Sequence, residues 1–127
     1  MASVLLVDDD PLVNDMVRLH LESVGHVVTS ARHGGEGLNA LEAAPVDLVI
    51  TDILMPEVEG IEFVMAIRRK GLDVPVLAMT GGMLQKLETG NLDFLQLAKK
   101  LGATETLRKP FTRTQLLEKV ALCLGRA

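Results

Sequence analysis

Five short apolar runs alternate with five segments of helical periodicity, and this alternation limits most strongly how the chain can fold. The apolar runs, which read as strands, lie at residues 4–7, 27–31, 46–52, 74–80 and 104–107. The segments that repeat apolar side chains every three or four positions lie at residues 11–24, 36–44, 61–71, 92–101 and 112–124. Strict alternation of strand and helix predicts a parallel sheet with helices on both faces. Because 127 residues are too few for an eight-stranded barrel, we expect one α/β domain over residues 1–127.

The third run carries the most informative residue of the chain. It is rich in β-branched side chains, as expected for a strand that is buried on both faces, and it ends at Asp52. Pro56 prevents the strand from continuing, and Gly60 is expected to permit a turn before the next helix. The carboxyl ends of parallel strands form the edge where open α/β sheets bind ligands. Asp52 is therefore expected at a functional edge.

The first helix is expected to place its apolar positions, Leu12 and Met16 among them, against the core. Asp10 is predicted to cap this helix, with Pro11 as its first residue. The stretch Thr112 to Gln115 has the form of a capping box for the last helix.

Composition excludes several classes of protein. Hydrophobic residues make up 48% and charged residues 24%, which is ordinary globular usage and argues against disorder. The net charge is −4 and the chain has no Trp or Tyr, so we expect no direct binding of nucleic acid. The single cysteine, Cys123, forms no internal disulfide and is expected in the core. The apolar run at residues 4–7 is too short for a membrane span or a signal sequence, so we expect a cytoplasmic protein without membrane contact.

Several polar side chains follow predicted strands and should meet at one edge of the sheet. These side chains are Asp8, Asp9, Asp10, Asp52, Thr80 and Lys109. Two carboxylates about 4 Å apart repel each other by about 4 kcal/mol at an effective dielectric constant near 20. A cluster of Asp8, Asp9 and Asp52 therefore requires a proton, a cation or a salt bridge. Oxygen ligands without His or Cys favour Mg²⁺.

The same edge offers groups that suit phosphoryl transfer. Lys109 can place a positive charge on phosphoryl oxygens, and Thr80 can donate a hydroxyl hydrogen bond. Gly81 and Gly82 leave backbone N–H groups unobstructed. Since a carboxylate is a competent nucleophile, the residues support Mg²⁺-dependent phosphoryl transfer onto Asp52.

Four ordered motifs carry a resemblance to a known family. They are Val7 to Pro11 with three consecutive aspartates, Asp52 to Pro56 with Gly60, Thr80-Gly81, and Lys109-Pro110-Phe111. Over essentially its whole length the chain resembles a response-regulator receiver domain of the stand-alone type. The resemblance implies a flavodoxin-like, doubly wound, five-stranded parallel sheet in the order 2-1-3-4-5 with five helices.

The resemblance also implies roles for the site residues. Asp52 would be the phosphoacceptor, and Mg²⁺ would be held by Asp8, Asp9, Asp52 and the backbone carbonyl of Leu54, with Asp9 a direct ligand. Thr80, Gly81 and Lys109 would bind the phosphoryl group and switch the domain. The phosphodonor would be a sensor histidine kinase or a histidine phosphotransfer protein. The output would pass to a downstream protein or a homodimer, and the only reactions catalysed would be the domain's own phosphorylation and dephosphorylation.

Two features depart from the family pattern. The position three residues before the lysine, which is often aromatic in the family, is Thr106 here. A switch in which an aromatic ring turns inward therefore cannot run in its usual form. Residues 82–91 read as an extended loop between Thr80 and Lys109, and this loop is expected to affect phosphoryl lifetime or partner choice.

Two other functions agree with parts of the sequence. A small Mg²⁺-dependent phosphatase with Asp8 as nucleophile and Asp10 as acid fits the strand followed by Asp-x-Asp. It would leave Asp52 without a role, and no acidic pair follows Lys109 to hold the metal. A flavin-binding module of similar topology would need a hydroxyl-rich phosphate loop after the first strand, where this chain has three aspartates.

Overall fold

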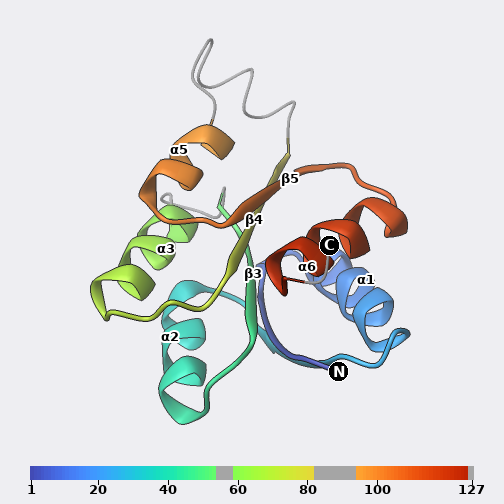
Figure 1. Ribbon diagram of the computed structural model, residues 1–127, viewed down its shortest axis with the longest axis horizontal. Coiled ribbons are helices and arrows are strands. Elements are labelled where there is room, and N and C mark those ends of the chain that lie inside the picture. Colours follow the sequence, from blue (N-terminus) through green and yellow to red (C-terminus); the bar gives the residue numbers. More distant parts are fainter. Residues whose placement is uncertain (54–58, 82–93, 126–127) are drawn as a thin grey trace.

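The structure, a computed structural model, describes residues 1–53, 59–81 and 94–125 (Figure 1). Its strands are β1 (Ser3–Val7), β2 (Val27–Ala31), β3 (Leu48–Asp52), β4 (Val76–Gly81) and β5 (Glu105–Lys109). Its helices are α1 (Pro11–Glu22), α2 (Gly34–Ala43), α3 (Glu59–Arg69), α5 (Phe94–Leu101) and α6 (Arg113–Cys123). All strand pairings are parallel and the sheet order is β2-β1-β3-β4-β5, which confirms the doubly wound fold expected from the sequence.

The sheet separates two layers of helices. Helices α2, α3 and α5 cover one face, and α1 and α6 cover the other (Figure 1). Each face of the sheet has its own hydrophobic core, and alternate residues of β1 point into one or the other. Leu5 and Val7 pack with α2 and α3, whereas Val4 and Leu6 pack with α1 and α6. The central strands are therefore buried on both faces, as their continuous apolar runs predict.

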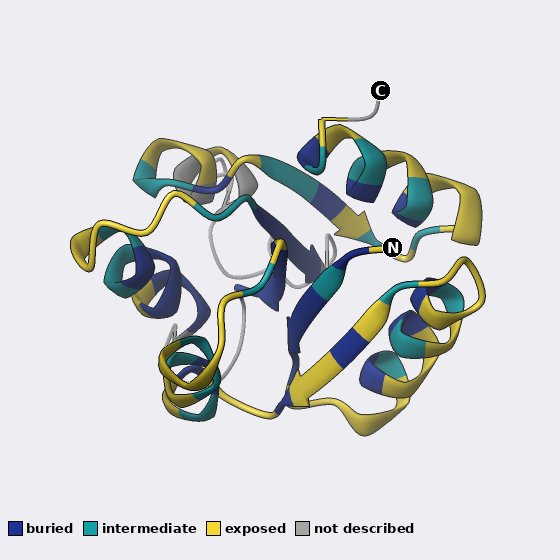
Figure 2. Ribbon diagram, turned by 60° about the horizontal axis from the view of Figure 1, so that its bottom comes forward, coloured by how far each residue is buried: buried dark blue, intermediate teal, exposed yellow. Residues whose placement is uncertain are grey.

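The edge strand β2 differs from the central strands. Exposed positions predominate along this strand (Figure 2). Only Val28 and Ala31 are buried, and Val27 is 55% exposed. β2 pairs with β1 on one side only within the described sheet, so fewer of its side chains are covered. The prediction of a strand at residues 27–31 is confirmed with its bounds.

Helix α1 corrects one expectation about the core. Leu12 is 79% exposed and Met16 is 38% exposed, so the prediction that both face the core is wrong. The buried positions of α1 are Asn14, Val17 and Leu21. Asp10 and Pro11 fix where the helix starts. This start determines which residues face the sheet, and it turns Leu12 and Met16 outward.

Several predicted boundaries also shift. Helix α1 ends at Glu22 rather than at residue 24, and Gly25 follows at a φ of 93°. Helix α2 begins at Gly34 rather than at residue 36, because His33 Nδ1 accepts a hydrogen bond from the Glu36 N–H at 3.3 Å and caps it. Strand β4 begins at Val76 rather than at residue 74. The predicted helix start at residue 92 lies outside the described residues.

Gly60 is the second residue of α3, so the expectation that it forms a turn before the helix is wrong. A Cβ at Gly60 would overlap the carbonyl oxygen of Asp52 and the Cα of Ile53. The start of α3 therefore packs directly on the end of β3, and only glycine leaves room for this approach. Within the described part of the chain, none of the helices is long and apolar enough to cross a bilayer.

Candidate metal and phosphoryl site

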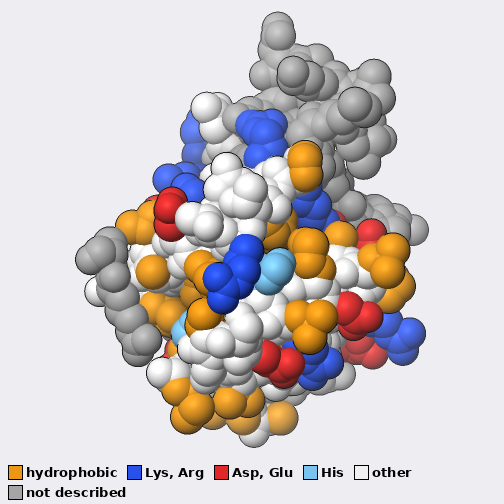
Figure 3. Space-filling model, turned by 90° about the vertical axis from the view of Figure 1, so that its right-hand side faces the viewer, with side chains coloured by type: hydrophobic (Ala, Val, Ile, Leu, Met, Phe, Trp, Pro, Cys, Tyr) orange, Lys and Arg blue, Asp and Glu red, His pale blue; other side chains and the backbone are white. Residues whose placement is uncertain are grey.

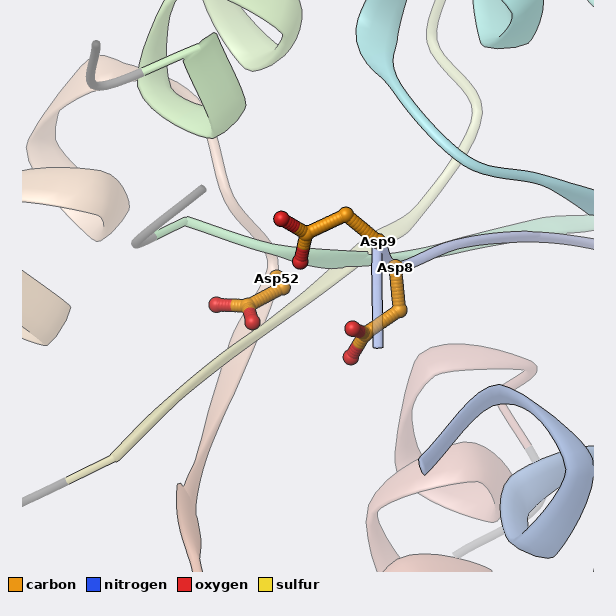
Figure 4. A group of neighbouring side chains, drawn as sticks. All are labelled: Asp8, Asp9 and Asp52. Atoms are coloured by element: carbon orange, nitrogen blue, oxygen red, sulfur yellow. The ribbon is translucent and has the colours of Figure 1, made fainter. Parts of the chain in front are cut away.

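Three carboxylates gather at the carboxyl ends of β1 and β3 (Figure 4). Asp8 and Asp9 directly follow β1, and Asp52 is the last residue of β3. One carboxylate oxygen from each residue lies within 4.8 Å of the others. Asp8 and Asp52 are buried and Asp9 is exposed, so the cluster opens to solvent on one side. The predicted convergence of Asp8, Asp9 and Asp52 is present.

Lys109 bridges two of these carboxylates. Its Nζ donates to Asp52 Oδ2 at 3.0 Å and to Asp8 Oδ2 at 3.1 Å. Lys109 is the last residue of β5, whereas the sequence placed it two residues beyond a strand at 104–107. Its pairing with Gly81 in β4 extends β5 to this edge.

The charges of the site shift two pKa values. Burial raises the pKa of Asp8 above its ordinary value, although the Asp10 N–H and the charge of Lys109 oppose this effect. Burial by itself would lower the pKa of Lys109, but the Asp52 and Asp8 carboxylates outweigh it and the pKa is raised. The ammonium therefore stays protonated and offsets part of the repulsion within the acidic cluster.

The segment that carries Asp8 and Asp9 is held by its own backbone. Asp8 Oδ1 accepts from the Asp10 N–H at 2.8 Å, and Asp10 Oδ1 accepts from the Leu12 N–H at 3.0 Å. Asp10 is thus the N-cap of α1, as predicted. Because its carboxylate serves the helix, this geometry does not favour Asp10 as the general acid of a phosphatase.

Thr80 carries an unusual buried hydroxyl. The side chain is fully buried in β4, and its Oγ1 has no hydrogen-bond partner among the described residues. A buried hydroxyl without a partner costs free energy, and such groups are uncommon in native proteins. Oxygen ligands, a lysine and an unused hydroxyl at one sheet edge fit Mg²⁺ together with a phosphoryl group.

The remaining predicted site positions are Gly81, Leu54, Thr106 and the loop at residues 82–91. Gly81 ends β4 next to Lys109, and Leu54 and the loop at 82–91 lie outside the described residues. Thr106 is half-buried on β5 and lines a hollow of about 900 Å³ between α5, β5 and α6. Lys109 lines the same hollow, so this residue belongs both to the acidic site and to the wall of the hollow.

Sequence reasoning missed Asn14. Its side chain is buried, and its Nδ2 donates to the backbone carbonyl of Asp8 at 3.3 Å. An asparagine next to Asp15 reads as part of the polar face of a helix, so the sequence contained no signal for this contact.

The sheet order and the acidic edge with its lysine define a flavodoxin-like receiver architecture. A family model described as the response regulator receiver domain matches residues 4–121. The chain therefore belongs to this family, whose members are signalling modules of two-component systems rather than conventional enzymes.

Known proteins support the assignment. The chain is 33% identical over 132 residues to a probable transcriptional regulatory protein of Picosynechococcus sp., covering 98% of this chain and 50% of that protein. It is 31% identical over 126 residues to the response regulator SaeR of Staphylococcus aureus, covering 99% and 52%. The chemotaxis response regulator CheY4 of Vibrio cholerae has a TM-score of 0.82 at 34% identity, covering 98% of this chain and 99% of that one. The chain thus spans about half the length of the curated relatives named here.

Proposed function

We propose that the domain accepts a phosphoryl group on Asp52 from a phosphohistidine of a sensor histidine kinase or a histidine phosphotransfer protein. The observation that carries this proposal is the cluster of Asp8, Asp9 and Asp52 with Lys109 bridging two of its members. Mg²⁺ would be held by Asp8, Asp9, Asp52 and the backbone carbonyl of Leu54, and would neutralise charge on the phosphoryl oxygens.

In the proposed reaction a carboxylate oxygen of Asp52 attacks phosphorus. The new bond is the acyl phosphate P–O bond, and the bond that breaks joins phosphorus to the imidazole nitrogen of the donor, which keeps the electron pair. Lys109 moves its ammonium from the two carboxylates onto the phosphoryl oxygens. Thr80 supplies its hydroxyl as a further donor, and Gly81, the last residue of β4, would offer its backbone N–H.

The signal would then leave the site through protein contacts. Because the chain has Thr106 and no Tyr, Lys109 and Thr80 must carry the change without an aromatic ring at the usual place. The recipient would be a downstream protein or a second copy of the chain. The side of the molecule turned to the viewer in Figure 3 mixes cationic, anionic and hydrophobic side chains, and this mixture supports protein contacts rather than direct nucleic-acid binding.

Phosphorylation with a small phosphodonor tests the proposal. With phosphoramidate and Mg²⁺, mass spectrometry should find one phosphoryl group, and peptide mapping should place it on Asp52. Asp52→Asn and EDTA should each abolish the modification. The exposed Asp73 provides a matched control, and Asp73→Asn should leave the modification unchanged. A modification that survives Asp52→Asn but disappears with Asp8→Asn would instead support the phosphatase.

A further inference from the structure

We propose that Asn14 is a positioning residue for the metal ligands, acting through the peptide bond that joins Asp8 to Asp9. This inference rests on the proposed function, since it assumes that Asp9 binds Mg²⁺. Asn14 has no part in the reaction described above, and it lies in the second turn of α1 rather than on the acidic segment itself.

The burial of Asn14 calls for an explanation. The residue is only 8% exposed, whereas the other buried positions of α1 are the apolar Val17 and Leu21. Asparagine is a poor helix former, and a buried amide costs free energy unless it is hydrogen-bonded. The contact that Asn14 makes is therefore the property that distinguishes it from its apolar neighbours.

That contact reaches the acidic pair. Asn14 Nδ2 donates to the backbone oxygen of Asp8 at 3.3 Å. The oxygen belongs to the peptide plane whose N–H is that of Asp9, so fixing it restricts rotation of the backbone just before Asp9. On the other side of Asp9, the Asp10 N–H donates to Asp8 Oδ1 at 2.8 Å. The backbone is thus anchored on both sides of Asp9.

Asp9 depends on this backbone more than Asp8 does. The Asp8 carboxylate is buried and bonded to Lys109 and to the Asp10 N–H, which fix its direction. The Asp9 side chain is exposed, so packing restrains its carboxylate less, and the position of this carboxylate depends more on the backbone that sets its Cα–Cβ bond. A metal ligand must be held in place to bind tightly, and groups that orient metal ligands commonly affect affinity tenfold or more.

The surroundings of Asn14 allow its positioning role to be tested without unfolding the protein. Asn14, Asp8 and Asp9 line a hollow of about 520 Å³ on the α1 side of the site. If the amide were removed, water in this hollow could hydrate the Asp8 carbonyl. Water would satisfy the oxygen without restricting the peptide plane. Asn14→Ala should therefore fold, yet hold Asp9 less firmly.

The test is a Mg²⁺ titration of the full chain, followed by the amide NMR shifts of Asp9 and Asp52. We expect Asn14→Ala to weaken Mg²⁺ binding about tenfold, near the lower end of what groups that orient metal ligands show. Val17→Ala is the matched control, because Val17 is buried on the same helix and its apolar side chain can donate no hydrogen bond to Asp8. It should lower the free energy of unfolding but change Mg²⁺ affinity less than twofold.

Phosphorylation supplies a second readout. In Asn14→Ala the Mg²⁺ concentration for half-maximal phosphorylation should rise about tenfold, while the rate at saturating Mg²⁺ should stay near that of the wild type. If Asn14→Ala keeps the wild-type Mg²⁺ affinity, or if Val17→Ala loses as much Mg²⁺ affinity as Asn14→Ala, the positioning role of Asn14 is overturned. Neither result contradicts the proposed function. A wild-type protein that shows no response to Mg²⁺ overturns the proposed function and this inference together. If Asn14→Ala does not fold, Asn14→Ser is used in its place with the same expectations.

Discussion

Lys109 Nζ lies 3.0 Å from Asp52 Oδ2, so the last residue of β5 is bonded to the last residue of β3 across the intervening strand β4. The same ammonium also reaches Asp8, which follows β1. One cation therefore links the carboxyl ends of β1, β3 and β5 at the edge where the acidic residues gather.

Replacing Lys109 by methionine should destabilise the metal-free protein by about 2 kcal/mol, because it leaves Asp8 and Asp52 facing each other without a cation. The pKa of Asp8, already raised by burial, should rise further. Addition of Mg²⁺ should recover much of the loss. Urea denaturation in EDTA and in Mg²⁺ measures both effects.

The control for this variant is Lys70→Met. Lys70 pairs with Glu42 at 3.1 Å, but the side chains are 45% and 63% exposed. Exposed pairs contribute little, so this variant should change the free energy of unfolding by less than about 0.5 kcal/mol. Equal losses in the two variants would contradict a special role for Lys109.

Thr80→Val should leave the stability of the unphosphorylated protein unchanged or raise it by up to about 1 kcal/mol, because the lost hydroxyl has no partner among the described residues. Thr51→Val is the matched comparison, since Thr51 is equally buried but its Oγ1 donates to the Asp52 carbonyl at 3.1 Å. It should cost about 1 kcal/mol. Beryllofluoride, which imitates the phosphoryl group, should bind less tightly to Thr80→Val. Unaltered binding would remove Thr80 from the phosphoryl site.

Gly60→Ala should destabilise the protein by about 2–3 kcal/mol, because the new Cβ would meet backbone atoms of Asp52 and Ile53 that cannot turn away. Gly35→Ala places its Cβ 3.3 Å from the His33 imidazole, a side chain that needs to shift by only a few tenths of an ångström. That variant should stay within about 1 kcal/mol of the wild type. Thermal unfolding of both variants, compared with the wild type, measures the difference.

Cys123 should make the stability fall at alkaline pH. Burial, assisted by the nearby Glu105, raises the pKa of Cys123 from 9.0 to about 11. Between these values the unfolded chain has lost the thiol proton while the folded chain keeps it, so the unfolded state binds fewer protons. The free energy of unfolding therefore falls as pH rises from 9 towards 11, by up to roughly 2 kcal/mol.

Urea denaturation at several pH values between 8 and 11 measures this effect. Cys123→Ala lacks the thiol, so its stability should fall less steeply over the same range. Parallel curves for the two proteins would show that the thiol makes no contribution.

Much of the fold could be predicted from the chain because strand and helix periods are properties of short segments. Asp10 caps α1 as expected, and Thr112 and Gln115 form the expected capping box of α6. The outward turn of Leu12 and Met16 was not predicted, because a helix with apolar residues on both sides does not reveal which side meets the core. The cap of α2 by His33 was missed because histidine is not among the common capping residues.

The candidate site also has a part that the sequence predicts and a part that depends on the tertiary structure. The sequence by itself determined which chemical groups stand at the ends of strands, because the identity of a residue and its place in an apolar run are local facts. Only the tertiary structure decided that Lys109 bonds to Asp52, 57 positions away, that Gly60 packs on the end of β3, and that Asn14 holds the Asp8 carbonyl. These contacts depend on the register of the strands and the packing of helices on the sheet. The distances between these residues are set by the packing of the whole core rather than by any one segment.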